Sequence, residues 1–220
     1  MGLTGFFLFG FVVAHMLGNL QIFLGPEWLN GYAQHLQEIP FLLWPARAFL
    51  IISLIVHMVL AIQLAIENKK ARPIPYVYQD TVEASLASRT MVFSGLVIFF
   101  FVIYHLLHFT FGKTNPDFYD LVDAKGRHDV YSMMVLSYQN IAISAAYLAA
   151  LFFLFMHLSH GAPRFLQSLG LTNDSRGTAC RAPMIERVGL GLAWIIFIGN
   201  CSIPLAVLFG LIRLPAGVVS

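Results

Sequence analysis

Residues 85–112 read SLASRTMVFSGLVIFFFVIYHLLHFTFG, and this stretch decides the fold. Between Thr90 and Leu107 its 18 residues contain no charged side chain other than a histidine, and that is about the shortest helix that crosses a membrane. The histidine, His105, is costly to bury at membrane depth and should face the interior of a helix bundle. Gly95 leaves a gap in the same bulky helix. We therefore expect a membrane helix with a large, flat group packed beside it.

The composition extends this interpretation to the whole chain. Of the 220 residues, 58% are hydrophobic and 11% are charged, whereas a soluble domain carries about 25% charged residues. The sequence predicts an all-α integral membrane protein in which residues 1–220 form a single domain. A net charge of +2 is too small to indicate nucleic-acid binding. Cys180 and Cys201 lack zinc or disulfide spacing and are expected to be free thiols. The first apolar run lacks the marks of a cleavable signal peptide.

Five apolar runs predict five transmembrane helices in one bundle. Gly25-Pro26 ends the first run, and Pro73 and Pro75 prevent continuation of the second. The fourth run begins with a small and polar half, NIAISAAYLAA. The expected helices cover residues 2–24, 40–67, 85–112, 130–161 and 188–212.

The distribution of positive charge predicts the orientation. Positively charged side chains gather in the second and fourth loops and at the adjoining helix ends, and only three lie in the other two loops. Because cytoplasmic loops carry an excess of Lys and Arg, the N-terminus and both basic loops are expected in the cytoplasm. The eight residues of the basic group are Lys69, Lys70, Arg72, Arg89, Arg164, Arg176, Arg181 and Arg187, and the other three are Lys113, Lys125 and Arg127.

One histidine lies in each of the first four apolar runs: His15, His57, His105 and His157. With a rise of about 1.5 Å per residue, His15 and His105 both lie about 20 Å from the cytoplasmic boundary. His57 and His157 lie at about 15 Å and about 10 Å. The four histidines therefore form an outer pair, His15 with His105, and an inner pair, His57 with His157. Two stacked b-type haems, each bound by imidazoles of two helices, require this arrangement and would transfer electrons.

Other residues are candidates for cofactor contacts. Gly95 lies at the inner level, where it could make room for the inner macrocycle. Arg47 lies near the outer level and either pairs with a haem propionate or a quinone or extends to the membrane surface. His108 and His160 either contact propionates or waters beside their neighbours or are interfacial. Arg89 could bond a propionate or a quinone carbonyl, and we favour the propionate.

Several motifs resemble one protein family. They are LTGFFLFGFVVAHMLGN at residues 3–19, SRTMVFSG at 88–95, YHLLHFTFG at 104–112, HLSHG at 157–161 and SIPLAVLFG at 202–210. They are similar to the cytochrome b membrane-anchor subunit of succinate:quinone oxidoreductases, in its single-subunit, five-helix, two-haem form, over nearly all of the chain. Members usually begin with a short basic, Ser-containing segment, so any cytoplasmic contact of that segment is missing or lies outside this chain.

The resemblance implies a function and a set of partners. In the family, the first and third helices hold the outer haem, and the second and fourth hold the inner one, which gives the same pairs as the depth argument. A flavoprotein with covalent FAD oxidises succinate, and an iron–sulfur subunit passes electrons to the anchor, which reduces a quinone. The expected setting is a bacterial cytoplasmic membrane, and the whole complex could form a higher oligomer. We expect menaquinone as the electron acceptor and no residue of this chain that is catalytic toward succinate.

Alternatives remain open at this level. The same parts working in reverse would make a quinol:fumarate reductase. A transporter could use the histidines directly, although no internal repeat is visible, and a haem-handling protein would need an accessible axial position. Candidate quinone contacts on the outer side are Glu38, Arg47 and His108, and those on the inner side are Ser85, Ser88, Arg89 and His160.

Overall fold

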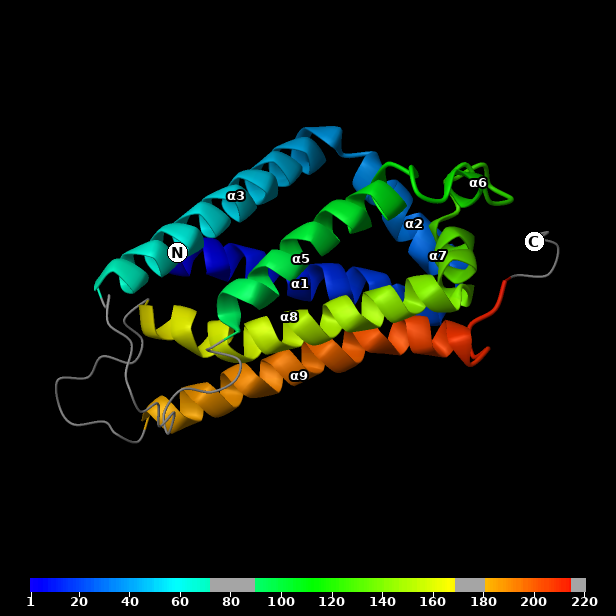
Figure 1. The fold of residues 1–220 in the computed structure, drawn as a ribbon. Coiled ribbons are helices and arrows are strands. Elements are labelled where there is room, and N and C mark those ends of the chain that lie inside the picture. Colours follow the sequence, from blue (N-terminus) through cyan, green and yellow to red (C-terminus); the bar gives the residue numbers. More distant parts are fainter. Residues whose placement is uncertain (72–89, 169–180, 215–220) are drawn as a thin grey trace.

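The fold is a bundle of five long helices (Figure 1). The structure is a computed structural model that describes residues 1–71, 90–168 and 181–214. Five segments within these ranges are long and apolar enough to cross a membrane. They contain α1 (Gly2–Asn19) with the 3₁₀ turn η1 (Leu20–Leu24), α3 (Pro40–Ala71), α5 (Met91–His105) with the π-helical turn η2 (Leu106–Thr110), α8 (Ile141–Ser168) and α9 (Arg181–Leu208).

Three shorter helices gather at one end of the bundle. These are α2 (Pro26–Gln37), α6 (Pro116–Tyr119) and α7 (Val130–Gln139). The start of α1 and the last turns of α3 and α8 lie at the opposite end (Figure 1). In the part of the chain that the structure describes, the β structure consists of one isolated bridge, between Val122 and His128.

The expected helices agree with the observed ones except at several boundaries. The prediction of one helix over residues 130–161 is wrong, because the chain separates into α7 and α8 at Asn140. Asn140 has an extended backbone (ψ 115°), and its Oδ1 accepts hydrogen bonds from the backbone N–H groups of Ala142 and Ile143. A side chain that satisfies the first N–H groups of a helix favours a new start at that position.

The other ends differ by shorter lengths. Helix α3 continues to Ala71, beyond the predicted end at residue 67, and α8 continues to Ser168. Helix α9 begins seven residues before the predicted position 188 and ends at Leu208, just before Gly210, which has a left-handed backbone (φ 68°). Residues 85–89 of the third predicted helix lie outside the described residues. Cys201 is a buried free thiol, and Cys180 also lies outside the described residues.

Helices α8 and α9 form the closest pair in the bundle. A Cβ atom at Gly189 of α9 would lie 2.7 Å from the ring of Pro163 in α8, and a Cβ atom at Gly199 would lie 2.6 Å from Met16 Sδ in α1. Small residues of this kind allow membrane helices to approach closely. Helix α9 therefore forms the packed side of the bundle.

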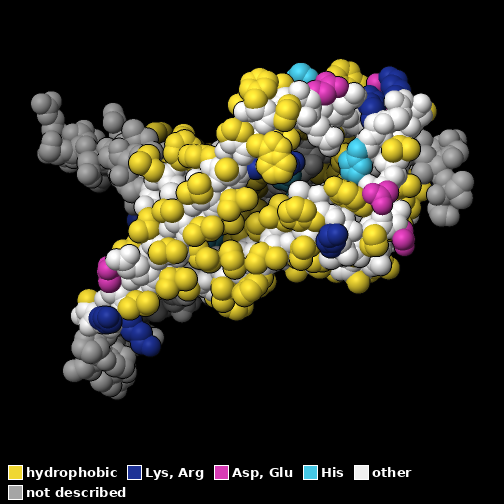
Figure 2. Space-filling model, turned by 90° about the horizontal axis from the view of Figure 1, so that it is seen from above, with side chains coloured by type: hydrophobic (Ala, Val, Ile, Leu, Met, Phe, Trp, Pro, Cys, Tyr) yellow, Lys and Arg dark blue, Asp and Glu magenta, His cyan; other side chains and the backbone are white. Residues whose placement is uncertain are grey.

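Helix α3 is the least buried of the five long helices. Ser53 is its buried residue, whereas Phe49, Ile52 and Ile55 are exposed. Hydrophobic side chains cover most of the face in Figure 2. An apolar helix surface that protein leaves uncovered is suited to contact with lipid.

Candidate functional site

The structure brings the four histidines of the apolar spans together in two pairs. The rings of His15 in α1 and His105 in α5 have centroids 5.6 Å apart and are perpendicular. The rings of His57 in α3 and His157 in α8 have centroids 6.4 Å apart at an angle of 65°. These are the same pairs that the depth argument selects. Whether they bind a metal remains a prediction.

Each histidine of the inner pair has a hydroxyl partner on a neighbouring helix. Thr4 Oγ1 lies 3.1 Å from His57 Nδ1 and donates its hydrogen to the carbonyl oxygen of Met1. Ser94 Oγ lies 3.2 Å from His157 Nδ1 and donates to the carbonyl oxygen of Met91. A hydroxyl group has one hydrogen, so with that hydrogen on the carbonyl oxygen each hydroxyl oxygen can accept a hydrogen bond from Nδ1–H, when Nδ1 carries the ring hydrogen. This tautomer leaves each Nε2 with a free lone pair, which is the form that binds a metal.

A glycine follows each of these hydroxyl residues and makes room for the same imidazole. A Cβ atom at Gly5 would lie 3.5 Å from His57 Cε1, and one at Gly95 would lie 3.3 Å from His157 Cε1. The predicted inner-level position of Gly95 therefore agrees with its contact to His157. The group that it accommodates directly is the histidine ring.

The segments Thr4–Gly5 and Ser94–Gly95 occupy equivalent places in two helices. Each lies 11 residues before the outer histidine of its own helix, counted from the hydroxyl residue to His15 or His105. At about 1.5 Å per residue, this spacing separates the inner and outer levels by roughly 16 Å. Helices α1 and α5 therefore each provide one outer histidine and, about three turns earlier, a hydroxyl residue and a glycine that contact an inner histidine. The resemblance motifs contain Thr4 and Ser94, but no role for either residue was predicted from the sequence.

The outer pair lies among aromatic side chains. Phe11 stacks on His15 with centroids 5.3 Å apart, and Phe101 and Phe109 contact His105. Tyr147 Oη lies 3.4 Å from His105 Nδ1. His15 is exposed, and the other three histidines are only partly covered by protein. Exposed imidazole surface is costly at membrane depth, so this surface is expected to be covered by something other than lipid.

The remaining predicted contacts have different surroundings. Arg47 is exposed, and its guanidinium group lies 5.1 Å from the centroid of Trp44. His108 is 2% exposed, and its two ring nitrogens lie near Tyr147 and Asn115. His160 is half-buried. Arg89, Ser85 and Ser88 lie outside the described residues.

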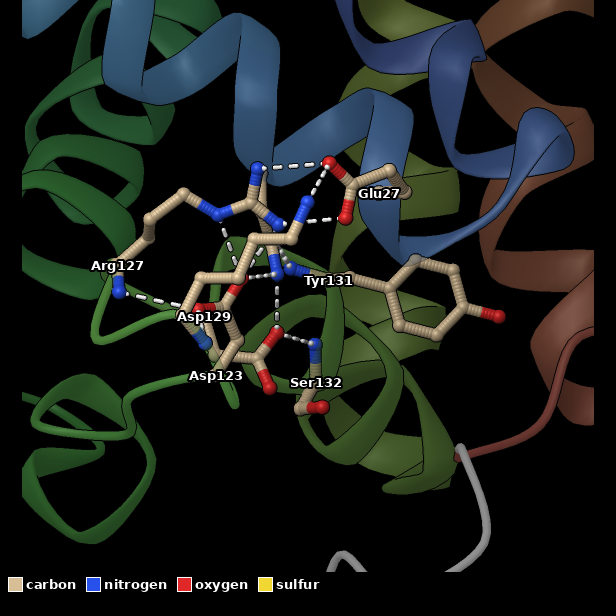
Figure 3. Close-up of polar contacts among 8 residues, drawn as sticks. Glu27, Asp123, Arg127, Asp129, Tyr131 and Ser132 are labelled. Atoms are coloured by element: carbon tan, nitrogen blue, oxygen red, sulfur yellow. Dashed lines mark hydrogen bonds and ion pairs between the residues drawn. The ribbon is translucent and has the colours of Figure 1, made fainter.

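A polar cluster that was not predicted from the sequence joins the connections at the end of the bundle (Figure 3). Asn30 of α2 is 1% exposed and donates to Asp129 Oδ1 at 2.9 Å. Asp129 also accepts from the backbone N–H of Ser132 at the start of α7, and Asn30 Oδ1 accepts from the N–H of Tyr131. The charged residues of the 113–129 segment were a signal, but their partners in α2 lie about 100 positions away.

Charge pairs extend this cluster to the surface. Arg127 pairs with Asp123 at 2.7 Å and with Glu27 at 3.0 Å. Burial alone would raise the pKa of Asp123, but hydrogen bonds from the Arg127 side chain and from the backbone N–H groups of Arg127 and Lys125 outweigh it and lower the pKa to about 2. The cluster therefore joins α2 to the loop of residues 123–129 and to the start of α7. Gln34 donates to Glu38, a candidate for the outer quinone site, at 2.8 Å in the exposed part of α2.

The geometry defines the class as a multi-pass helical membrane protein with five candidate spans and two intramembrane histidine pairs. Groups of three or more His, Cys, Asp or Glu residues that could hold a metal do not occur in the described ranges. Comparisons with protein-family models, curated proteins and solved structures find no match to this chain.

Proposed function

We propose that the chain is the two-haem cytochrome b anchor of a succinate:quinone oxidoreductase. The observation that carries this proposal is the meeting of four histidines from four helices in two pairs. The porphyrin of a b-type haem supplies four nitrogens to its iron, and the protein would supply the remaining two ligands. Each histidine pair offers two imidazoles for this purpose. His15 and His105 would hold the outer haem, and His57 and His157 would hold the inner one.

The ring spacing supports this assignment. The ring centroids lie 5.6 Å apart in the outer pair and 6.4 Å apart in the inner pair. Because metal–imidazole bonds are about 2 Å long, each pair could hold one metal ion between its rings. At the inner pair, the hydroxyl groups of Thr4 and Ser94 lie within hydrogen-bond distance of Nδ1, and an Nδ1–H tautomer would leave Nε2 free for a metal.

The orientation follows from the charge pattern. Lys69 and Lys70 end α3 at the same end of the bundle as the N-terminus, and we place this end in the cytoplasm. The iron–sulfur subunit, with the FAD flavoprotein behind it, would dock at this end. The membrane would be the cytoplasmic membrane of a bacterium.

Bound haem supplies one-electron transfer. The histidines of the chain would hold the inner and outer haems, and electrons from the iron–sulfur subunit would pass through them to a membrane quinone, for which we propose menaquinone. Because His108 is buried and both its nitrogens have protein neighbours, we do not assign it to direct quinone contact. The half-buried His160, near the cytoplasmic end of α8, is the better candidate among the described residues. For Arg89 we retain the contact to a haem propionate as a proposal.

A reduced-minus-oxidised optical spectrum of the purified chain tests the proposal. Two low-spin b-type haems per chain, measured against protein concentration, would support it. Copurification with a flavoprotein and an iron–sulfur protein, together with succinate-dependent haem reduction, would support the assignment to the complex. A chain expressed with an adequate haem supply that contains no haem would contradict the assignment, and high-spin haem would favour a haem-handling protein instead.

A further inference from the structure

We propose that Tyr147 is a positioning residue for the imidazole of His105, and that His108 and Asn115 hold Tyr147 in its place. The inference rests on the proposed function, because it assumes that His105 binds the outer iron through Nε2. It adds three residues to the outer site that do not touch the iron themselves. Their effect would reach the metal through one hydrogen bond.

A continuous chain of polar contacts carries the inference. Tyr147 Oη in α8 lies 3.4 Å from His105 Nδ1 and 2.9 Å from His108 Nδ1. The opposite nitrogen of His108, Nε2, lies 3.1 Å from Asn115 Nδ2 in the connection that follows η2. The chain therefore runs from a partly buried loop residue, through a buried histidine and a buried tyrosine, to a proposed ligand.

The burial of this chain indicates a specific role. His108 is 2% exposed and Tyr147 is 4% exposed. Phe109 stacks on the His108 ring with centroids 4.1 Å apart, and Phe101 meets the Tyr147 ring edge-on at 5.0 Å. Polar groups in an apolar interior are costly unless they pair with one another. The aromatic side chains restrict both rings, so the hydroxyl group of Tyr147 stays near His105.

The hydrogens in this chain can follow two consistent orders. In the inward order, Asn115 donates to His108, His108 donates to Tyr147, and Tyr147 donates to His105 Nδ1. In the outward order, His105 Nδ1–H donates to Tyr147, Tyr147 donates to His108 Nδ1, and His108 Nε2–H donates to the side-chain oxygen of Asn115 after its amide turns over. A metal on His105 Nε2 requires a hydrogen on Nδ1, so metal binding selects the outward order.

A hydrogen bond accepted from the Nδ1–H group makes a ligand imidazole more basic. A more basic ligand stabilises the oxidised iron relative to the reduced iron and lowers the reduction potential. Removal of the Tyr147 hydroxyl group should therefore raise the potential of the outer haem. The proposed ligands of the inner haem, His57 and His157, have separate hydroxyl partners, Thr4 and Ser94. The potential of the inner haem should therefore not change.

Redox titration of the purified protein, followed optically, tests this inference with the variant Tyr147→Phe. The expected result is a positive shift of one of the two haem potentials, while the other stays at its wild-type value. Tyr138→Phe is the matched control, because Tyr138 is a buried tyrosine that packs against Tyr147 with centroids 5.2 Å apart, outside the polar chain. It should leave both potentials unchanged.

The variant Asn115→Ala provides a second measurement that does not depend on a core substitution. It removes the last member of the chain from a partly buried loop position and should shift the same haem in the same direction by a smaller amount. Two haems with wild-type potentials in both Tyr147→Phe and Asn115→Ala would overturn this inference and leave the proposed function intact. A wild-type chain without haem would overturn both.

Discussion

At the scale of single residues, the main feature is the use of hydroxyl groups to select the form of a histidine. Thr4 and Ser94 each donate their hydrogen to a backbone carbonyl oxygen three residues earlier. Each oxygen can then only accept from the imidazole of another helix. Such a contact favours the Nδ1–H tautomer, which leaves Nε2 available for a metal. Partners of this kind typically change metal affinity by about 10- to 100-fold when they are removed.

We expect Ser94→Ala and Thr4→Val to weaken retention of the inner haem, because His157 and His57 lose the acceptors for Nδ1–H. The measurement is the haem-to-protein ratio after dilution or competition with a haem-binding protein. Ser159→Ala is the matched control, because the Ser159 hydroxyl also donates to a carbonyl oxygen three residues earlier, that of Met156 in α8, and makes no hydrogen bond to a histidine of the described residues. Equal haem retention in all three variants and the wild type would argue against a role of these hydroxyl groups.

A second residue-scale prediction concerns the space beside His157. In Gly95→Leu the added side chain would start 3.3 Å from His157 Cε1 and push the ring from its position, so the inner haem should be lost. Gly191→Leu is the control, since a Cβ atom there meets no atom within 4 Å. Spectra of the two purified variants decide the matter. If Gly95→Leu retains two haems, this contact does not shape the site.

At the scale of helices, the apolar runs were sufficient to predict five spans, because a membrane helix needs little beyond length and hydrophobicity. The break at Asn140 could not be predicted, since it depends on a side chain turning to cap the next helix. Histidine depth predicted which residues meet, because rise per residue converts directly to height. The contacts of Thr4 with His57 and of Ser94 with His157 were not predicted, because the sequence does not specify which face of one helix meets a histidine on another.

The polar cluster beside α2 and α7 illustrates the same limit. Each participant is an ordinary loop or surface residue in the sequence. The pairing of Asn30 with Asp129, or of Glu27 with Arg127, joins positions about 100 residues apart. Only the folded bundle brings them together, so this part of the molecule could not be predicted from local patterns.

The cluster should make stability depend on pH through Asp123. Its pKa of about 2 lies below the ordinary value of 3.8, so the folded state favours the charged form. This contribution is complete above about pH 4 and is lost as the pH falls toward 2. The thermal midpoint of the wild type should therefore fall more steeply between pH 4 and pH 2.5 than that of Asp123→Asn. Asp117→Asn, an exposed carboxylate of α6, should follow the wild type, and parallel curves for all three proteins would refute the assignment.

At the scale of the whole molecule, the bundle has a well-packed side at α8 and α9 and a loosely covered side at α3. The histidine pairs join α1 to α5 and α3 to α8 across this bundle. In the proposed function, two haems tie these helices together, so α3 would depend on the inner haem for part of its packing. The polar cluster fixes the end away from the N-terminus (Figure 1).

Haem content and spectra after replacement of single ligands test the central claim most directly. We predict that His57→Ala and His157→Ala each remove the inner haem and retain the outer one, and that His15→Ala and His105→Ala do the reverse. The two variants of each pair should therefore share one residual spectrum and one residual potential, which differ between the pairs. Retention of two wild-type haems in any of the four variants, or a different grouping of the residual spectra, would contradict the account.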